Sequence, residues 1–296
     1  MKLAVGTAQF GNQYGITNTS GKLAQKEADK ILNVARENSI EFLDTASLYG
    51  SSETIIGRGI FTTDKFKIIS KTIKFDNDQI SNLDIKKLEE NFFISLERMK
   101  QESIYAILVH RSSDLKKKNS EKFFDKLIEF KNKKLVKKVG VSTDNKNDLE
   151  MLIEKYPIDI VQIPINIFNQ TFVKGKILSI LKKKKIETHA RSIFFQGILL
   201  NKYGKKNKVV DFFEPYMKQL KKELKIRKIN ILDCALKFVD QIENIDVGIV
   251  GVLNEKQLKE IIKVHRKNTQ KIDFLDDFKI NSQYVNPSSW NNLFFK

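Results

Sequence analysis

Leu-Asp-Thr-Ala-Ser-Leu-Tyr-Gly, at residues 43–50, follows a short apolar run and carries two side chains suited to catalysis, Asp44 and Tyr49. Later in the chain, Lys71 and His110 each stand at the end of a further apolar, strand-like run. Parallel strands joined by right-handed crossovers end on the same side of a sheet, so these side chains are expected to meet. The order of these stretches therefore predicts an α/β fold with its active site at the C-terminal ends of the strands.

Strand-like and helical patterns alternate along almost the whole chain. The predicted strands are 2–7, 41–45, 67–72, 104–110, 136–142, 158–163, 186–192 and 246–250. The predicted helices repeat apolar residues at i, i+3 and i+4, and they cover 25–38, a short stretch from about 52, 84–100, 120–131, 148–156, 175–183, 229–241 and 255–264. Eight strand–helix units without a Pro/Gly/Ser linker predict a single (β/α)8 TIM barrel spanning residues 1–296.

Length alone would also allow two smaller domains, and an open doubly wound sheet is the alternative architecture. Such a sheet needs a glycine-rich turn after its first strand to hold a pyrophosphate. The corresponding turn, Gly-Thr-Ala-Gln-Phe-Gly at 6–11, has two glycines at an unsuitable spacing. The closed barrel is therefore preferred.

Two segments fall outside the regular alternation. Residues 193–228 form a long excursion that includes Asn-Lys-Tyr-Gly at 201–204 and a predicted helix at 212–224; a segment of this length suggests a lid over cofactor or substrate. Residues 265–296 form a tail expected to pack back against the barrel. Its apolar residues would either only dock the tail or also close the pocket: Phe274, Phe278, Tyr284, Trp290, Leu293 and Phe294.

The formal net charge of +17 raises the question of a nucleic-acid partner. The basic clusters at 115–118, 182–185 and 221–228 lie beside apolar residues at helical spacing, which is typical of solvated helix faces. There is no zinc-finger spacing and no aromatic–basic ribonucleoprotein motif in the sequence. We therefore expect no nucleic-acid partner, but a mild attraction for anionic substrates.

The sequence has no run of about 20 apolar residues, so no membrane partner is expected. The N-terminus enters a strand pattern at once, without signal-peptide architecture, and the single cysteine, Cys234, excludes an internal disulfide. These features suggest a cytoplasmic protein. His189 and His265 have no metal-ligand spacing, so no metal site is expected.

The four candidate side chains together suit proton transfer to a carbonyl group. A tyrosine with its usual pKa of about 10 is a poor acid unless a nearby cation stabilises the phenolate. Lys71 could supply that cation, Asp44 could hold Lys71, and His110 could orient the carbonyl oxygen.

Each of these residues has an ordinary structural explanation when it is taken alone. Asp44 could cap a helix, Tyr49 could be a turn aromatic, Lys71 is one of many lysines, and His110 could be a satisfied core histidine. Their joint order at successive strand ends favours the catalytic interpretation.

From Gly6-Thr7 to about Glu260, the chain resembles the aldo-keto reductase family. The stretch 44–50 carries the family's aspartate and tyrosine, Lys71 matches its lysine, and His110 matches its histidine. The resemblance implies that Tyr49 is the general acid, tuned by Lys71 and Asp44, with His110 orienting the carbonyl. It further implies an NAD(P)H-dependent oxidoreductase that interconverts an aldehyde or ketone, sugar-like or anionic, with its alcohol.

The same resemblance assigns residues to the nicotinamide dinucleotide, which would lie extended across the barrel mouth. The implied cofactor-binding residues are Gly6, Thr7, Ser142, Gln162, Arg191, Ser192, Gln196, Gly197, Gly251, Asn254 and Gln257. Thr143 stands where the family usually has asparagine, and Arg191 stands where an aromatic commonly stacks on the nicotinamide. The charge of Arg191 suggests a preference for substrates with a carboxylate or phosphate, the alternative being stacking alone.

NADPH is the family default, but the stretch 250–258 offers Lys256 as its only cation for a 2′-phosphate, so NADH or dual use is also predicted. The family also contains channel-associated members. A cofactor-binding regulatory subunit with little turnover is therefore the alternative function. The sequence leaves the oligomeric state and the physiological substrate open.

Overall fold

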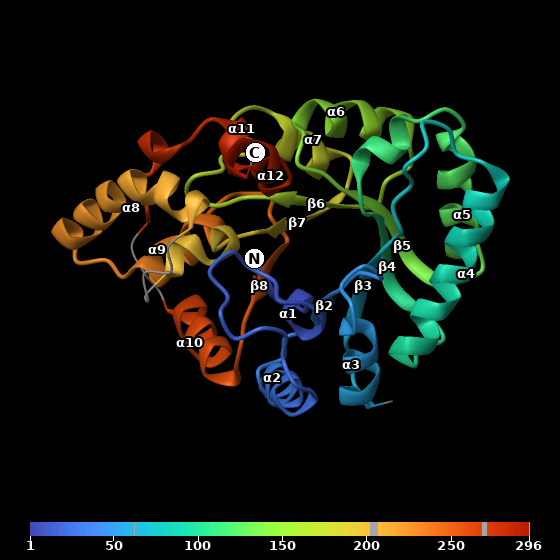
Figure 1. Cartoon of the computed structure of the whole chain (residues 1–296), viewed down its shortest axis with the longest axis horizontal. Helices are drawn as coiled ribbons and strands as arrows, with labels where there is room; N and C mark the ends of the chain where they lie inside the picture. Colours follow the sequence, from blue (N-terminus) through green and yellow to red (C-terminus); the bar gives the residue numbers. More distant parts are fainter. Residues whose placement is uncertain (62, 202–206, 268–270, 296) are drawn as a thin grey trace.

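Eight parallel strands close into one barrel in the computed structural model, which describes residues 1–61, 63–201, 207–267 and 271–295 (Figure 1). The strands pair in chain order and β8 pairs with β1. They are β1 Lys2–Gly6, β2 Phe42–Asp44, β3 Lys67–Lys71, β4 Ile104–Val109, β5 Val136–Ser142, β6 Ile160–Pro164, β7 Glu187–Arg191 and β8 Val247–Gly251. The predicted (β/α)8 barrel is confirmed.

Helices surround the strands as an outer layer (Figure 1). The principal ones are α2 Gln25–Glu37, α3 Ser52–Gly59, α4 Asn82–Met99, α5 Ser120–Asn132, α6 Lys146–Lys155, α7 Ile177–Lys183, α8 Lys208–Arg227, α9 Ile231–Asp240 and α10 Glu255–Arg266. Short elements join or follow them: α1 Ala8–Gly11, η1 Ser112–Lys116, η2 Phe195–Leu200, η3 Asp276–Phe278, α11 Ser282–Val285, η4 Pro287–Ser289 and α12 Trp290–Phe294. Side-chain caps define several helix starts; Ser81 and Asp84, for example, form a complete capping box at α4.

Alternation along the strands determines which side chains enter the barrel. One apolar cluster consists of the inward-facing residues Ala4, Phe42, Ile69, Ala106, Leu108, Ile160, Val247 and Ile249. A second and larger cluster fills the space between the strands and the helices. Because side chains on a strand alternate between its two faces, Asp44, Lys71 and Gln162 share the inward face with the first cluster.

A charged network lies at the N-terminal ends of β5 and β7. The Glu187 carboxylate accepts hydrogen bonds from the Tyr105 hydroxyl (2.6 Å), from Lys138 and, on its other oxygen, from His189 Nε2 (2.5 Å). Burial alone would raise the pKa of Glu187, but these partners lower it to about 2. The carboxylate therefore stays ionised inside the base of the barrel, opposite the candidate site.

The excursion at 193–228 is mostly helical. After the turn η2, helix α8 begins at Lys208, earlier than the sequence pattern indicated, because the Asn207 side chain caps it by accepting from Val210 N (2.9 Å). Of the predicted Asn-Lys-Tyr-Gly stretch, residues 202–204 lie outside the described part of the chain. The interpretation of 193–228 as a lid over cofactor or substrate stays a prediction.

The C-terminal tail lies beside β6 and α8 (Figure 1). The Gln170 side chain donates to Leu275 O (2.8 Å), and Ile280 N donates to Phe168 O (3.0 Å). Trp290 is buried and packs its ring against Phe195 and Phe213, whereas Leu293 is 43% exposed. These contacts fix the tail to the segments that follow β6 and β7 and to α8.

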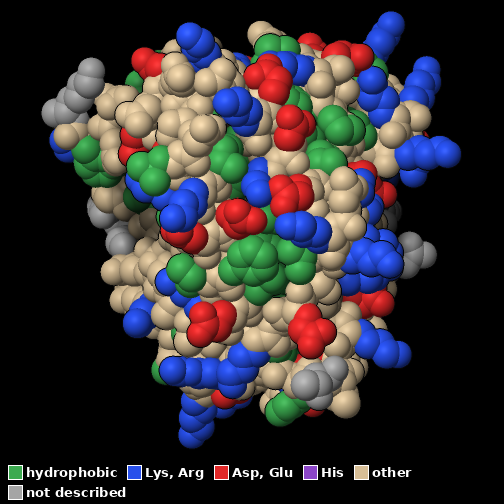
Figure 2. Space-filling model, turned by 90° about the vertical axis from the view of Figure 1, so that its right-hand side faces the viewer, with side chains coloured by type: hydrophobic (Ala, Val, Ile, Leu, Met, Phe, Trp, Pro, Cys, Tyr) green, Lys and Arg blue, Asp and Glu red, His purple; other side chains and the backbone are tan. Residues whose placement is uncertain are grey.

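Figure 2 shows basic and acidic side chains mixed over one face of the molecule. Many of the lysines are paired, as in the contacts of Lys126 with Glu129 (2.6 Å) and of Lys131 with Asp159 (2.6 Å). Within the described ranges, no helix is long and apolar enough to cross a membrane.

Candidate active site

A cavity of about 690 Å³ opens at the C-terminal ends of the strands. It is lined by two of the four predicted catalytic residues, Asp44 and Tyr49. Nine of the predicted cofactor-binding residues line it as well: Gly6, Gln162, Arg191, Ser192, Gln196, Gly197, Gly251, Asn254 and Gln257. Four predicted residues do not line the cavity: Lys71, His110, Thr7 and Ser142. Of these, Lys71 and His110 lie beside the Tyr49 ring.

The Lys71 ammonium lies deep in the barrel, where Asp44 neutralises it. Lys71 Nζ donates to both carboxylate oxygens of Asp44 (2.8 and 2.9 Å) and to Thr45 O (2.8 Å). The same ammonium lies 5.0 Å from the centre of the Tyr49 ring. Three residues from β2, β3 and the loop after β2 thus meet, as the sequence predicted.

The electrostatics of Tyr49 differ from the expectation that Lys71 acidifies the phenol. Burial raises the pKa of Tyr49, the Asp44 carboxylate raises it further, and the Arg191 guanidinium lowers it. Burial likewise lowers the pKa of Lys71, with Asp44 opposing that shift. Because burial disfavours the phenolate and Asp44 cancels the nearby ammonium, the phenol is held in its protonated form, which is the form a general acid requires.

The His110 ring stands edge-on to Tyr49, with ring centres 5.9 Å apart. Burial lowers the pKa of His110 to about 3, and the nearby cations Lys71, Lys74 and Arg191 lower it in the same direction. Its Nδ1 is buried and has no hydrogen-bond partner among the described residues. The imidazole is therefore neutral and has one nitrogen free to bind a ligand atom.

Close backbone packing positions the Tyr49 loop. A Cβ atom on Gly11 would lie 1.7 Å from Tyr49 O, so only glycine allows α1 to approach this loop. The Ser52 hydroxyl lies 2.8 Å from Thr7 Oγ1 and 3.0 Å from Thr45 Oγ1, which ties the ends of β1 and β2 to the start of α3. Sequence reasoning missed Gly11, although it closes the turn 6–11.

Gln162 on β6 offers a binding group to the cavity. Its Nε2 donates to Asp44 Oδ1 (2.7 Å), while its Oε1 is buried without a partner in the described chain. An orphaned amide oxygen inside a cavity wall fits the amino group of a carboxamide such as that of nicotinamide. Thr143, by contrast, is occupied with Ser112 Oγ (3.0 Å) and Asn145 O (3.2 Å).

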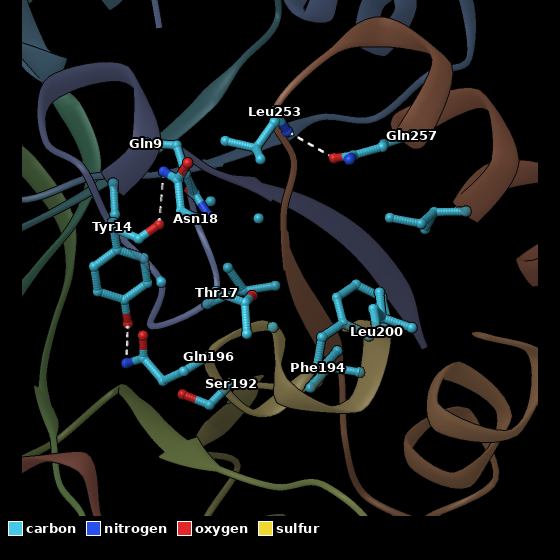
Figure 3. Close-up of a pocket in the computed structure, with 18 of the residues that line it drawn as sticks. Gln9, Tyr14, Thr17, Asn18, Ser192, Phe194, Gln196, Leu200, Leu253 and Gln257 are labelled. Atoms are coloured by element: carbon cyan, nitrogen blue, oxygen red, sulfur yellow. Dashed lines mark hydrogen bonds between the residues drawn. The ribbon is translucent and has the colours of Figure 1, made fainter. Parts of the chain in front are cut away.

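The segment after β7 crosses the cavity in a strained conformation. Ser192, Phe195 and Gln196 have positive φ angles of 59°, 49° and 57°. The Gln196 amide donates to the Tyr14 hydroxyl (2.9 Å), which joins this segment to the loop after α1 (Figure 3). Three non-glycine residues in this region cost about 1–2 kcal/mol each, so the surrounding contacts must hold the turn.

The start of α10 forms the far end of the cavity. Asn254 caps the helix by accepting from Gln257 N (2.9 Å), and Gln257 Oε1 accepts from Leu253 N (2.8 Å; Figure 3). Lys256 and Glu260 line the same end, so a cation and an anion are both present there. The free backbone donors of a helix N-terminus suit a phosphate group.

Arg191 ends β7 and faces the cavity, but its charge is not free. Arg191 Nη2 donates to Asp144 Oδ1 (2.7 Å), in the loop after β5. Sequence reasoning missed Asp144; its only signal was its place two residues after Ser142, at the end of β5. The pairing weakens the hypothesis that Arg191 recruits anionic substrates, because part of its charge is already neutralised.

Most of the chain matches one known protein family. A family model described as the aldo/keto reductase family matches residues 2–279. No significant match was found among curated protein sequences.

Several solved structures are similar over most of their length. An aldo-keto reductase from Bacillus halodurans in its holo form has a TM-score of 0.72 at 14% identity, covering 96% of this chain and 90% of the other. A glycerol dehydrogenase from Gluconobacter oxydans has a TM-score of 0.67 at 18% identity, with 93% and 90% covered. A Pseudomonas aeruginosa protein described as a putative aldo-keto reductase has a TM-score of 0.66 at 18% identity, with 89% and 88% covered. At these identities, the likeness shows the fold alone.

Proposed function

This chain belongs to the aldo/keto reductase family, and from that premise we propose that it is an NAD(P)H-dependent enzyme that interconverts an aldehyde or ketone with the corresponding alcohol. The observation that carries the proposal is the meeting of a protonated phenol, a neutral imidazole and a buried ion pair beside one cavity. A protein that only bound a dinucleotide would have no use for this arrangement.

The proposed chemistry divides tasks among the residues of this chain. A bound nicotinamide dinucleotide would supply the hydride to the carbonyl carbon. As charge builds on the carbonyl oxygen, the Tyr49 hydroxyl donates its proton to that oxygen, and the phenolate later regains a proton from water. A His110 ring nitrogen orients the oxygen by a hydrogen bond, which a neutral imidazole can donate.

Asp44 connects the acid to the cofactor pocket. One of its oxygens, Oδ1, accepts from both Lys71 and Gln162, at 2.8 and 2.7 Å. This contact orients Gln162 so that its free Oε1 can receive the carboxamide. We propose that Ser142 adds a second contact to that group, and that Gly6, Ser192, Gln196, Gly197 and Gly251 line the path of the dinucleotide.

We further propose that NADH is used at least as well as NADPH. At the end of the cavity formed by α10, Lys256 would attract a 2′-phosphate, but Glu260 would repel it. Asn254 and Gln257 are already engaged in capping the helix. If NADPH bound more than tenfold tighter than NADH in a fluorescence titration, this preference would be refuted. If Glu260→Gln left the affinity for NADPH unchanged, the repulsion assigned to Glu260 would be refuted.

A nicotinamide absorbance assay tests the proposed function. The panel would contain glyceraldehyde, a neutral aromatic aldehyde and an aldehyde with a carboxylate, each with NADH and with NADPH. We expect consumption of one reduced cofactor per alcohol formed, and its loss in Tyr49→Phe with the cofactor affinity retained. Equal turnover in Tyr49→Phe, or binding of cofactor without turnover of any aldehyde, would contradict the proposal; the second result would favour a regulatory subunit.

A further inference from the structure

Arg191 is a second cation at this site, besides Lys71. It follows His189 on the inward face of β7 and lines the cavity together with Asp44, Tyr49 and Gln162. Its side chain is 22% exposed, so water screens its charge only in part. Tyr14 and Tyr49 both line this cavity with Arg191, and the guanidinium lowers the pKa of each of them and that of Lys71.

The two cations near Tyr49 differ in how completely they are neutralised. Lys71 contacts both oxygens of Asp44 inside the barrel, where the carboxylate side chain is 7% exposed. Arg191 contacts one oxygen of Asp144, whose side chain is 30% exposed and therefore better solvated. Among the described residues, its other polar contact is a long one to the Ser192 hydroxyl (3.4 Å). More of the positive charge is thus left uncompensated at Arg191 than at Lys71.

We propose that Arg191 and Asp144 form a second tuning pair of this site, in which the guanidinium stabilises the Tyr49 phenolate and Asp144 attenuates that effect. The inference rests on the function proposed above. Both are positioning residues that act through Tyr49. The pair matters most for alcohol oxidation, in which the Tyr49 phenolate would take the hydroxyl proton of the alcohol and a bound oxidised nicotinamide would supply the hydride acceptor.

Substitution of each member of the pair distinguishes an electrostatic effect on Tyr49 from a purely structural contact. Arg191→Gln removes the stabilising charge, and we expect kcat for alcohol oxidation at saturating oxidised cofactor to fall about tenfold, as for one pKa unit. Asp144→Asn frees the guanidinium, and kcat at the same pH is expected to rise severalfold. Arg191→Lys, which keeps the charge, should retain more of the rate than Arg191→Gln. The probe is the alcohol of the fastest aldehyde in the panel, glycerol if that aldehyde is glyceraldehyde.

A readout that needs no turnover is the ionisation of the phenol itself. Protein labelled with fluorotyrosine would be titrated by ¹⁹F NMR, with the Tyr49 resonance identified by its loss in Tyr49→Phe. The expected order of midpoints, from low to high, is Asp144→Asn, parent and Arg191→Gln.

The proposal is overturned if both substitutions lower kcat to the same extent with the same pH dependence, or if the three midpoints coincide. Those results would leave the pair a structural contact. The proposed function fails by a different result, the persistence of turnover in Tyr49→Phe. In that case the order of the NMR midpoints still decides whether the pair acts on Tyr49.

Discussion

At the scale of single residues, Asp44 shows why the site could be anticipated only in part. Its place at the end of β2 follows from the apolar run before it, and its contact with Lys71 follows from the parallel order of the strands. The effect of that contact on the pKa of Tyr49 could not be derived from the sequence. Burial of the whole group, visible only in three dimensions, raises the pKa of Tyr49 instead of lowering it.

His110 gives a prediction at this scale. Because burial and the neighbouring cations lower its pKa to about 3, the ring should remain neutral at every pH above about 5. The chain has three histidines, so ¹H–¹³C NMR of the imidazole Cε1 groups, assigned by His110→Asn, can follow each ring. The His110 signal should not titrate near the usual value of about 6.5. A midpoint there would mean that the ring is solvated or paired with an acid, and that its orienting role needs another explanation.

At the scale of elements, the segment after β7 depends on the C-terminal tail. Phe195, in its left-handed conformation, is buried among the rings of Phe213 (4.8 Å), Trp290 (5.6 Å) and Phe168 (5.8 Å). The next residue, Gln196, lines the cavity. The described residues of the tail therefore support the cavity wall from behind without lining the cavity, an arrangement between the two roles that the sequence left open.

Removal of the indole tests this dependence. Trp290→Ala should lower the free energy of unfolding by about 3 kcal/mol, as is usual for a large buried ring, and should weaken cofactor binding about tenfold by loosening Gln196. The exposed neighbour supplies the control: Leu293→Ala should change either quantity little. Urea denaturation and cofactor fluorescence titration measure the two effects. If Trp290→Ala left the cofactor affinity at the parent value, the tail would serve stability alone.

The strands and helices also show which features could be predicted from the sequence and which could not. The sequence located all eight strands, because the apolar runs are too short for helices and alternate with longer segments of helical periodicity. It did not predict that α8 begins at Lys208, which depends on the Asn207 cap. It also did not predict that Arg191 meets Asp144, which depends on how the loop after β5 approaches the end of β7. Local patterns identify elements, whereas contacts between loops require the assembled molecule.

At the scale of the whole molecule, the two ends of the barrel carry different charge networks. The functional end holds the Lys71–Asp44 pair, and the base holds Glu187 with Lys138, His189 and Tyr105. Asp159 and Asp246 also lie near the base and add negative charge there. We expect the base to contribute stability and the opposite end to contribute chemistry.

The base network predicts how stability depends on acid. The folded-state pKa of Glu187, about 2, lies below the usual value of 4.5, so its contribution is fully present above about 4.5 and is lost as the pH falls toward 2. The pKa difference corresponds to roughly 3 kcal/mol. Glu187→Gln should therefore be less stable than the parent by a few kcal/mol at neutral pH, with the two unfolding curves converging at low pH. A difference that stays constant from neutral to acidic pH would show that packing, not charge, is lost.

The proposed active site is tested most directly by a crystal structure of the protein with oxidised cofactor and an unreactive carbonyl ligand. We predict that the ligand oxygen lies about 3 Å from Tyr49 Oη and from a ring nitrogen of His110, with the nicotinamide carboxamide on Gln162 Oε1. A ligand oxygen bound away from Tyr49, or a nicotinamide ring outside the cavity that Gln162 and Arg191 line, would contradict the assignment of this site to carbonyl reduction.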